Sequence, residues 1–301
     1  MSSDSAPRGT PLRIAFQGEA GSFSDEALQQ LWGGGAERLP FRDFADVTAA
    51  VASGIADRGV LPIENTIVGS IAASHDAINA LPGIFAVAET VVDVHHCLLV
   101  SPGTQFETLT TVLSHPMAIA QCGRFFAEHP QLEVHSVYDT AGAAMDVSKV
   151  ADPTMAAVAS RRAAAHYDLE IVRADIEDRP DNQTRFLAIA RAPAPLPAGT
   201  PARTMIILTA VDRPGSLLEA LAPLARHGAN IRRLEPRPTG EPWSYRFFVE
   251  FDHEVGDAAA EAVTRDIAAA AEETRLLGTY PRWGAGRRGS IGWKSGAGRT
   301  A

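Results

Sequence analysis

Three short segments place hydroxyl, amide and carboxylate side chains beside glycine and other small residues. They are residues 17–22 (QGEAGS), 62–70 (PIENTIVGS) and 114–116 (SHP), and Gln121 follows the third on the next predicted helix. Each lies where a predicted strand ends and a helix begins, and the free backbone N–H groups of a helix start can bind an anion. An N-cap alone explains any one segment. Because the three recur at the same end of successive strands, they predict a ligand-binding cleft there.

A fourth segment, residues 181–186 (DNQTRF), leads into another predicted strand. Alternation along a strand places Thr184 and Phe186 on one face and Arg185 on the opposite face. From spacing alone, an ordinary strand with a β-branched residue and a solvated arginine is the better interpretation. The segment becomes a candidate site only through its resemblance to a family, described below.

Signatures of metal and nucleotide chemistry are weak. His95 and His96 would point to opposite faces of a strand, so they could not both bind one metal ion without distortion. The two cysteines, Cys97 and Cys122, form no C-x-x-C pair, which excludes a disulfide scaffold and indicates a reducing compartment. The sequence contains no H-E-x-x-H, P-loop or G-x-S-x-G motif. Catalysis would therefore use hydroxyls, amides, one carboxylate and backbone dipoles, with no metal and no cofactor.

The elements that would position these residues alternate between strand and helix up to residue 190. Predicted strands cover residues 13–16, 38–41, 59–63, 111–114, 132–138, 156–159, 169–172 and 184–190, with one or two more over 85–100. Predicted helices cover residues 24–32, 44–53, 69–81, 116–128, 141–150 and 161–167. This alternation predicts α/β layers with mainly parallel sheets.

A proline-rich segment, residues 192–202 (APAPLPAGTPA), predicts a semi-rigid linker. The order after it is βαββαβ, with strands at 204–211, 230–235, 243–252 and 275–280 and helices at 215–226 and 257–273. This is the ferredoxin-like pattern, whose uncovered sheet face or edge favours dimerisation. The glycine-rich basic tail, residues 283–301, is predicted to be disordered.

Composition limits the class of protein. The 301 residues carry a net charge of −9 and are 46% hydrophobic, which is typical of a globular chain of about two domains. The acidic balance argues against a nucleic-acid partner. No apolar run reaches the ~18 residues of a membrane span, and the first residues lack the apolar core of a signal peptide. We therefore expect a cytoplasmic protein without a membrane partner.

Taken together, the motifs resemble those of prephenate dehydratase in order and spacing. They are IAFQGEAGSFS from residue 14, LPIENTIVGS from residue 61, SHP with Gln121, and NQTRFLAI from residue 182. Downstream, PGSLLEAL from residue 214 and NIRRLEPRP from residue 230 resemble the regulatory ACT domain of that enzyme. The resemblance extends over nearly all of the chain between residues 13 and 280.

The resemblance implies an architecture and an activity. It implies a catalytic domain over residues 12–192, made of two α/β lobes similar to type II periplasmic binding proteins. A linker over 193–202 and a ferredoxin-like ACT domain over 203–282 would follow. The family converts prephenate to phenylpyruvate in L-phenylalanine biosynthesis and is inhibited by L-phenylalanine. A homodimer or homotetramer is expected, because an effector site shared by two ACT domains would need a second copy.

The resemblance also assigns roles to single positions. The catalytic hydroxyl falls on Thr184, with Glu64 and Asn65 as the active-site carboxylate and amide. The substrate-binding positions are Ser114, Gln121, Arg185 and Phe186, and the effector positions are Gly215, Leu217, Leu221 and Asn230. Two positions depart from the family pattern. Ser216 replaces the usual alanine, and Pro236 replaces a serine, which removes a hydroxyl and a backbone donor and is predicted to change effector affinity.

Two alternatives stay open at this point. Two binding-protein-like lobes joined to an amino-acid-binding module would also suit a non-catalytic ligand sensor. The other alternative is the sister reaction on arogenate, which carries an amino group where prephenate carries a keto group. Nothing in the sequence separates the two substrates.

Overall fold

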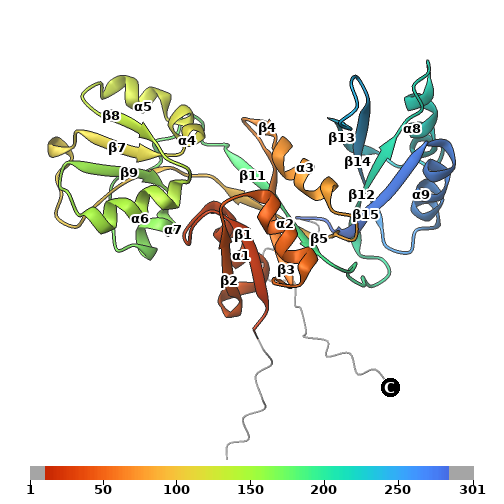
Figure 1. Ribbon diagram of the computed structural model, residues 1–301, viewed down its shortest axis with the longest axis horizontal. Coiled ribbons are helices and arrows are strands. Elements are labelled where there is room, and N and C mark those ends of the chain that lie inside the picture. The colour runs from red at the N-terminus through yellow and green to blue at the C-terminus, as the bar shows by residue number, and fades with distance from the viewer. Residues whose placement is uncertain (1–10, 285–301) are drawn as a thin grey trace, which may run out of the picture.

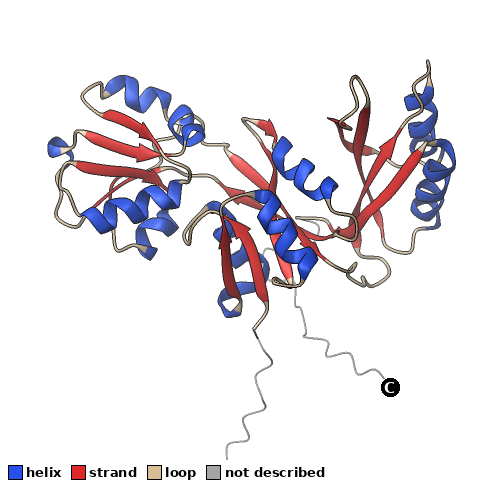
Figure 2. Ribbon diagram, in the orientation of Figure 1, coloured by secondary structure: helices blue, strands red, loops and turns tan. Residues whose placement is uncertain are grey.

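The computed structural model describes residues 11–284, which form two α/β lobes and a C-terminal unit (Figure 1). Within these residues each lobe is a sheet covered by helices, and the C-terminal unit has its two helices on the outer side of its sheet (Figure 2). The chain passes from the first lobe into the second and back. The predicted two-lobed α/β architecture with a further α/β unit is confirmed.

The first lobe is built on a six-stranded sheet. Its strands, in spatial order, are β2 (Glu37–Phe41), β1 (Arg13–Gln17), β3 (Arg58–Asn65), β11 (Gln183–Ala190) and β5 (Phe85–Asp93), with β4 (Gly69–Ser70) paired to β3. β1 is parallel to both β2 and β3, whereas β11 is antiparallel to both β3 and β5. The prediction of mainly parallel sheets is therefore wrong for this lobe. β11 enters from the second lobe rather than through a helical crossover, so it can run in the opposite direction.

The helices of the first lobe are α1 (Phe23–Trp32), η1 (Gly33–Gly35), α2 (Phe44–Ser53) and α3 (Ala72–Ala80). The helix predicted over residues 69–81 begins later, because Gly69 and Ser70 form β4 instead. Gly69 has a φ of +82° and pairs with Asn65, so a tight turn follows β3 before the helix starts.

The second lobe contains a five-stranded sheet. Its order is β10 (Glu170–Arg173), β6 (Cys97–Val100), β9 (Met155–Ala159), β7 (Thr111–Ser114) and β8 (Glu133–Ser136). Its helices are η2 (Phe106–Thr108), α4 (Pro116–Gln121), α5 (Gly123–Glu128), α6 (Thr140–Val150) and α7 (Arg161–His166). The region 85–100 thus forms two strands, one in each lobe, and the helix predicted over 116–128 is interrupted at Cys122. β10, β6 and β9 are antiparallel neighbours, so this sheet is also mixed.

The C-terminal unit (residues 201–281) is an antiparallel sheet of order β13 (Ile231–Pro238), β14 (Tyr245–Glu254), β12 (Pro201–Thr209) and β15 (Glu273–Pro281). α8 (Ser216–Arg226) and α9 (Ala258–Ala270) cover one face, where Ile206, Leu224 and Val263 form its own core. β12 begins at Pro201, inside the predicted linker, because Pro201 and Ala202 already pair with β14.

The other face of this sheet packs directly against the first lobe. Met205, Phe248 and Leu277 belong to the same buried cluster as Leu61 and Ile189 of the first lobe. The approach is close: a Cβ placed on Gly278 would lie 2.3 Å from the carbonyl oxygen of Ala86. The C-terminal unit is therefore docked on the first lobe through a shared core.

The end of the described chain continues this contact. The backbone N–H of Trp283 donates to Glu89 Oε1 at 2.9 Å. The rest of the tail predicted to be disordered, residues 285–301, lies outside the described residues. Within residues 11–284, every helix is too short or too polar to span a membrane.

Candidate active site

Thr184 lies on β11, next to β3, the strand that carries Glu64 and Asn65. The register pairs Thr184 with Asn65 of β3 and Arg185 with Glu64. Because successive side chains of a strand point to opposite faces, these are two adjacent cross-strand pairs on opposite faces of the sheet. One pair is neutral and the other is charged.

The neutral pair is held by hydrogen bonds that fix the amide of Asn65. Its Oδ1 accepts from the backbone N–H groups of Ile67 and Val68, at 2.9 and 3.0 Å. Its Nδ2 shares its two hydrogens among three acceptors, Asn182 Oδ1 at 2.8 Å, Thr184 Oγ1 at 3.0 Å and the carbonyl oxygen of Gln183 at 3.0 Å. Thr184 is thus an acceptor in this bond, and the hydrogen of its hydroxyl stays available for another acceptor.

The network continues into the second lobe. Asn182 Nδ2 donates to Gln121 Oε1 at 2.9 Å, and His96 Nε2 donates to the same oxygen at 2.8 Å. The ring of Phe23, at the start of α1, packs edge-on against His96. Burial lowers the pKa of His96 below its ordinary value, so its imidazole is neutral at pH 7. The end of β3, the start of α1 and the end of α4 therefore meet around this network.

Two members of this network were not predicted as site residues. Asn182 lies two residues before Thr184, and the period of a strand could have placed both side chains on one face. His96 gave no usable signal, because its partner Gln121 is 25 residues away and on a different element. Thr184, Asn65 and Gln121, predicted from the resemblance, are brought together.

The charged pair faces the C-terminal unit. Arg185 donates through Nε to Glu64 at 3.1 Å, through Nη1 to Glu89 at 3.0 Å, and through Nη1 and Nη2 to Glu250 at 2.8 and 2.9 Å. Although burial alone would lower the pKa of Arg185, the facing carboxylate of Glu250 raises it well above its ordinary value. Arg185 and Glu64 therefore lie on the side of the sheet opposite the Thr184 hydroxyl.

Two further predicted residues lie within the protein interior. Phe186 is buried in the first lobe, in the cluster that contains Phe16 and Val92. Ser114 is fully buried, and its Oγ donates to the carbonyl of Val158 at 2.7 Å. The hydroxyl of Ser114 thus donates to a backbone carbonyl, and the ring of Phe186 packs in the core of the first lobe.

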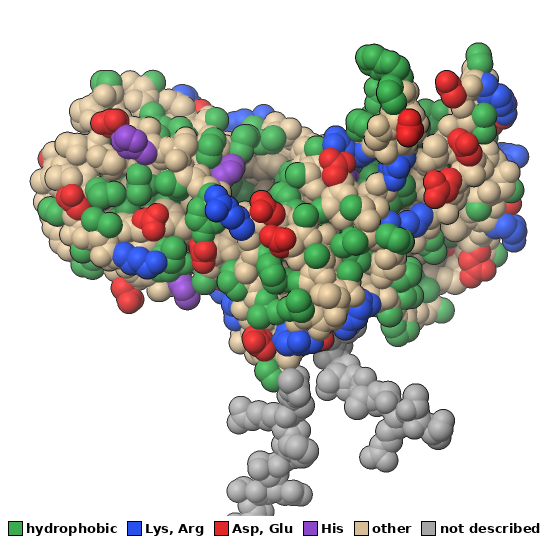
Figure 3. Space-filling view, viewed as in Figure 1, with side chains coloured by type: hydrophobic (Ala, Val, Ile, Leu, Met, Phe, Trp, Pro, Cys, Tyr) green, Lys and Arg blue, Asp and Glu red, His purple; other side chains and the backbone are tan. Residues whose placement is uncertain are grey.

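The two lobes touch beside this network. Asp139, the N-cap of α6, accepts from the N–H of Glu19 at 3.1 Å, and Ser160 Oγ donates to the carbonyl of Gly21 at 2.7 Å. Burial raises the pKa of Asp139. A cavity of about 290 Å³ lies here, lined by Gly18, Glu19, Pro40, Phe41, Arg42 and Tyr138. The surface is hollowed between the two lobes (Figure 3).

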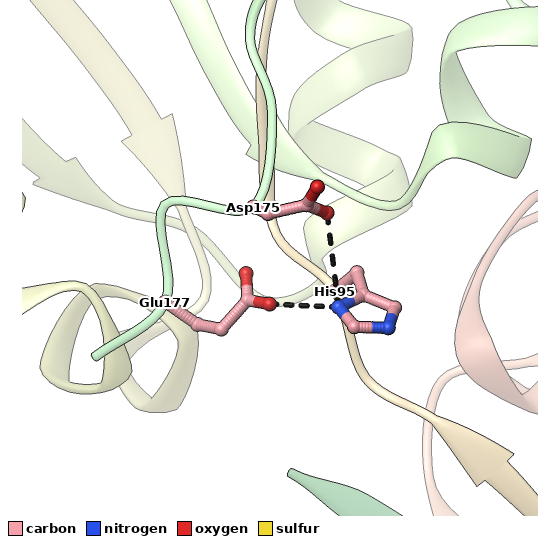
Figure 4. A group of neighbouring side chains, drawn as sticks. All are labelled: His95, Asp175 and Glu177. Atoms are coloured by element: carbon pink, nitrogen blue, oxygen red, sulfur yellow. Dashed lines mark hydrogen bonds and ion pairs between the residues drawn. The ribbon is translucent and has the colours of Figure 1, made fainter. Parts of the chain in front are cut away.

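The segments that connect the lobes carry one group of side chains with the composition of a metal site. His95 Nδ1 lies 2.7 Å from Glu177 Oε1 and 3.7 Å from Asp175 Oδ1 (Figure 4). Arg161 already pairs with both oxygens of Asp175, at 2.8 and 2.7 Å, and Glu177 Oε2 accepts from the N–H of His96. These bonds explain the group as an ion-pair cluster that ties the two connections together. His95 and His96 point to different partners, as expected.

The predicted effector residues lie around the start of α8 and beside β13. Gly215 is the exposed N-cap of α8 with a φ of +85°, a backbone conformation that favours glycine. Leu217 and Leu221 are partly buried against the core of the C-terminal unit, and Asn230 is exposed just before β13. Pro236 lies within β13, an edge strand, where a missing backbone donor is tolerated.

Comparison with known proteins gives the family. Residues 14–194 match the family model for prephenate dehydratase, and residues 204–270 match that for the ACT domain. This chain belongs to the prephenate dehydratase family.

Relatives of this family align over most of the chain. An Arabidopsis thaliana protein named arogenate dehydratase/prephenate dehydratase 2, chloroplastic, is 35% identical over 288 residues, which cover 92% of this chain and 75% of the relative. A structure of prephenate dehydratase from Arthrobacter aurescens in complex with L-Phe is 30% identical, with a TM-score of 0.82 over 90% of each chain. A structure of GqqA, described as a novel type of quorum quenching acylase, is 34% identical, with a TM-score of 0.80 over 89% of this chain and 97% of that one.

Proposed function

We propose that this protein converts prephenate to phenylpyruvate in the formation of L-phenylalanine in the cytoplasm. The reaction breaks the bond between the ring and a carboxylate, and that electron pair completes the aromatic ring. The ring C–O bond breaks as hydroxide leaves, and the hydroxide becomes water when it takes up a proton. Aromatisation supplies the driving force, so the enzyme mainly has to assist the departing hydroxide.

The observation that carries this proposal is the direction of the bond between Asn65 and Thr184. Since Thr184 Oγ1 accepts from Asn65 Nδ2 at 3.0 Å, its own O–H can donate to the departing hydroxyl of the substrate. Accepting one hydrogen bond strengthens the hydroxyl as a donor for the next. A weakly acidic hydroxyl is thereby suited to stabilise negative charge on a leaving oxygen.

The neutrality of the surrounding network suits this substrate. Prephenate carries two carboxylates, and the side chains linked to Thr184 are the uncharged amides of Asn65, Asn182 and Gln121. The carboxylate of Glu64 is paired with Arg185 on the other face of the sheet. A negative ligand that approaches Thr184 therefore does not face the carboxylate of Glu64.

The likeness to GqqA makes hydrolysis of an acyl amide the second candidate. Such hydrolysis by a threonine nucleophile requires a base that accepts the hydroxyl proton. Among the described residues, no histidine or carboxylate hydrogen-bonds to Thr184 Oγ1, and His96 donates to Gln121 instead. The geometry therefore favours a hydrogen-bond donor at Thr184 over a nucleophile.

The proposal includes inhibition by L-phenylalanine bound to the C-terminal unit. The N–H groups at the start of α8 could receive the carboxylate of an amino acid, and Leu217 lies near enough in sequence to contact its side chain. The edge strand β13 exposes Leu234, and Trp243, in the turn between β13 and β14, is 91% exposed, so a second copy could cover this region. A homodimer or homotetramer is part of this proposal.

The test offers the purified protein prephenate, arogenate and an N-acyl amide in separate assays with a chelator present. We expect phenylpyruvate from prephenate without an added metal ion or cofactor. Phenylalanine formed from arogenate at a higher kcat/KM would reassign the substrate. Release of a free acid from the acyl amide, with no turnover of the other two, would favour the acylase. Ligand binding without any turnover would favour a sensor.

The effector test uses the full chain, because removal of the C-terminal unit would expose the core it shares with the first lobe. L-Phenylalanine is titrated into the prephenate assay and into a calorimeter, with D-phenylalanine as the control. We expect saturable binding and inhibition by the L form alone. Binding without inhibition would refute the regulatory part, and absence of binding would indicate that Pro236 has disabled the site.

A further inference from the structure

The charged face of β11 joins the candidate active site to the C-terminal unit. Glu250 is fully buried in the middle of β14, and it receives both Nη groups of Arg185. The Arg185 side chain is only 11% exposed, and all three of its nitrogens donate to carboxylates. Each guanidinium nitrogen of Arg185 thus already has a carboxylate partner, and none is left to bind a carboxylate of the substrate.

The C-terminal unit also balances the charge on this face. Arg203 of β12 lies 3.2 Å from Glu89 and 3.7 Å from Glu250, and its Nε donates to Asp252 at 2.8 Å. Glu89 belongs to β5, on the other side of β11 from β3. Buried carboxylates require such counter-charges, so the cluster is complete only when the C-terminal unit is docked.

A second contact reaches the strand that carries Asn65. Arg233 of β13 donates to Ser70 Oγ at 2.9 Å and to the carbonyl of Ile63 at 3.4 Å. The pairing of β3 and β11 shifts between Arg185 and Phe186, and this shift leaves Ile63 as an extra residue on β3. The irregular backbone directly before Glu64 and Asn65 is thereby held by an arginine of the C-terminal unit.

We propose that Arg185 is a positioning residue, which Glu250 of the C-terminal unit holds so that β11 presents the Thr184 hydroxyl to the substrate. Thr184 and Arg185 share one peptide bond. A guanidinium bound by three carboxylates restricts the backbone on both sides of Arg185. An error of about 1 Å in the placement of a catalytic group can lower a rate by roughly 100-fold. The role of Arg185 rests on the proposed function, in which Thr184 acts on the leaving hydroxyl.

The first test compares two acid-to-amide variants at the junction between the units. Glu250→Gln removes the charge that holds Arg185. Asp76→Asn is the matched control, since Asp76 also lies at the junction and pairs with Arg237 of β13 at 2.9 and 2.6 Å, a pair that does not involve β11. We expect Glu250→Gln to lower kcat by about 10- to 100-fold and to change KM by less than about threefold. Asp76→Asn should leave kcat and KM within about twofold of the wild-type values. Equal effects of the two variants would refute the proposal.

A double-mutant cycle separates positioning from general loss of structure. In the Thr184→Val background the hydroxyl is gone, so a residue that acts through it has nothing left to position. We expect Glu250→Gln to have little further effect on kcat there. A residue that only stabilises the fold would lower kcat by the same factor in both backgrounds, and that result would overturn the proposal. If Glu250→Gln does not fold, Arg185→Lys, which keeps the buried positive charge, takes its place in the cycle.

Hydrogen exchange provides a measurement that does not depend on turnover. The amides of Ile67 and Val68 donate to Asn65, and the amide of Thr66 donates to the carbonyl of Gln183. Glu250→Gln should accelerate exchange over residues 64–68 and 183–186, and Asp76→Asn should not. Unchanged protection in Glu250→Gln would refute the positioning role. If the wild-type protein turns over neither prephenate nor arogenate, the proposed function fails, and exchange still decides whether Glu250 orders these strands.

Discussion

Thr184 and Arg185 are neighbours on one strand, yet their side chains enter surroundings of opposite character. The Thr184 face is a chain of amides and one neutral imidazole, in which the hydroxyl oxygen of Thr184 accepts a hydrogen bond from Asn65. The Arg185 face is an ion cluster in which each guanidinium nitrogen is bound. The two faces of β11 therefore differ in what they can offer a ligand. The Thr184 hydroxyl can donate a hydrogen bond on the uncharged face, whereas every guanidinium nitrogen of Arg185 is already bound on the charged face.

The energetics of the two faces differ as well. A buried ion pair gives little net stability, because desolvation offsets the attraction, but the loss of one partner is strongly destabilising. Hydrogen bonds among neutral groups contribute only about 1 kcal/mol each, and they add no charge to the Thr184 face. Variants of the neutral face should therefore affect rate more than stability, and variants of the charged face should affect both.

Replacement of Thr184 by valine tests the neutral face most strongly. It keeps the branched shape and removes the hydroxyl, so kcat should fall by about 10²- to 10⁴-fold, the range for loss of a positioned acid–base group. Steady-state kinetics with prephenate measure the effect. The melting temperature should hardly change, and Thr184→Ser, which restores a hydroxyl, should recover much of the rate. Near-normal turnover in Thr184→Val would make the residue structural.

Replacement of Arg185 by methionine tests the charged face. It removes the guanidinium closest to Glu89 and Glu250, whose side chains are 1% and 0% exposed, and leaves Arg203 as the cation that they share. We expect a loss of about 3–5 kcal/mol in the free energy of unfolding, measured by urea denaturation. Arg237→Met removes an arginine from the more exposed pair with Asp76 and should cost less than about 1 kcal/mol. A similar loss in both variants would contradict the distinction between the buried and exposed pairs.

Local rules could predict the opposite orientation of these two residues. Period-two alternation places Thr184 and Arg185 on different faces, and the structure has them so. The helix predicted over residues 44–53 occupies those residues, and Gly54 ends it in the left-handed region with a φ of +81°. These features depend on a few consecutive residues, which the sequence displays directly.

The partners of Arg185 could not be predicted in this way. Glu89 is 96 residues away and Glu250 is 65 residues away, on a different unit, and only the strand order places them around β11. For the same reason the motif around Glu64 did not reveal that its carboxylate pairs with Arg185, on the face opposite Thr184. The expectation of mainly parallel sheets failed for a related reason: the alternation of elements does not show that β11 returns from the second lobe.

Replacement of Asn65 by aspartate gives a finer test of the neutral face. Aspartate can still accept from the N–H groups of Ile67 and Val68, but it cannot donate to Thr184. It also places a negative charge beside the hydroxyl. We expect kcat to fall by about 10- to 100-fold, less than in Thr184→Val, because the hydroxyl itself remains. Asn65→Ala, which loses the turn as well, should be less stable than Asn65→Asp.

A rate for Asn65→Asp equal to that of the wild type would show that the donated hydrogen bond has no part in the reaction. A loss as large as that of Thr184→Val would indicate instead that the new carboxylate captures the hydroxyl proton. A pH profile tests the second explanation. If the carboxylate captures the hydroxyl proton, the loss in kcat should become smaller at low pH, where the carboxylate is protonated.

The smallest expected effect concerns a histidine buried behind the charged face. His75 of α3 donates through Nδ1 to the carbonyl of Ile71 at 3.1 Å and packs edge-on against Phe248 of β14. Burial, and then the nearby positive charge of Arg233, lowers the pKa of His75 in spite of Glu235 and Glu250. An unfolded chain takes up this proton near pH 6.5, whereas the folded chain resists it to lower pH. The unfolded state therefore binds more protons below pH 6.5, and folding stability falls as the pH falls.

His75→Phe keeps the ring contact with Phe248 and removes the titrating group. Between pH 6.5 and pH 5.5 the wild type should lose more folding free energy than this variant, by at most about 1 kcal/mol, since one proton corresponds to about 1.4 kcal/mol per pH unit. Urea denaturation at several pH values measures the difference in slope. His96 on the neutral face has a pKa lowered by burial too, so some acid sensitivity should persist in His75→Phe. Equal slopes for wild type and variant would mean that protonation of His75 does not oppose folding in this pH range.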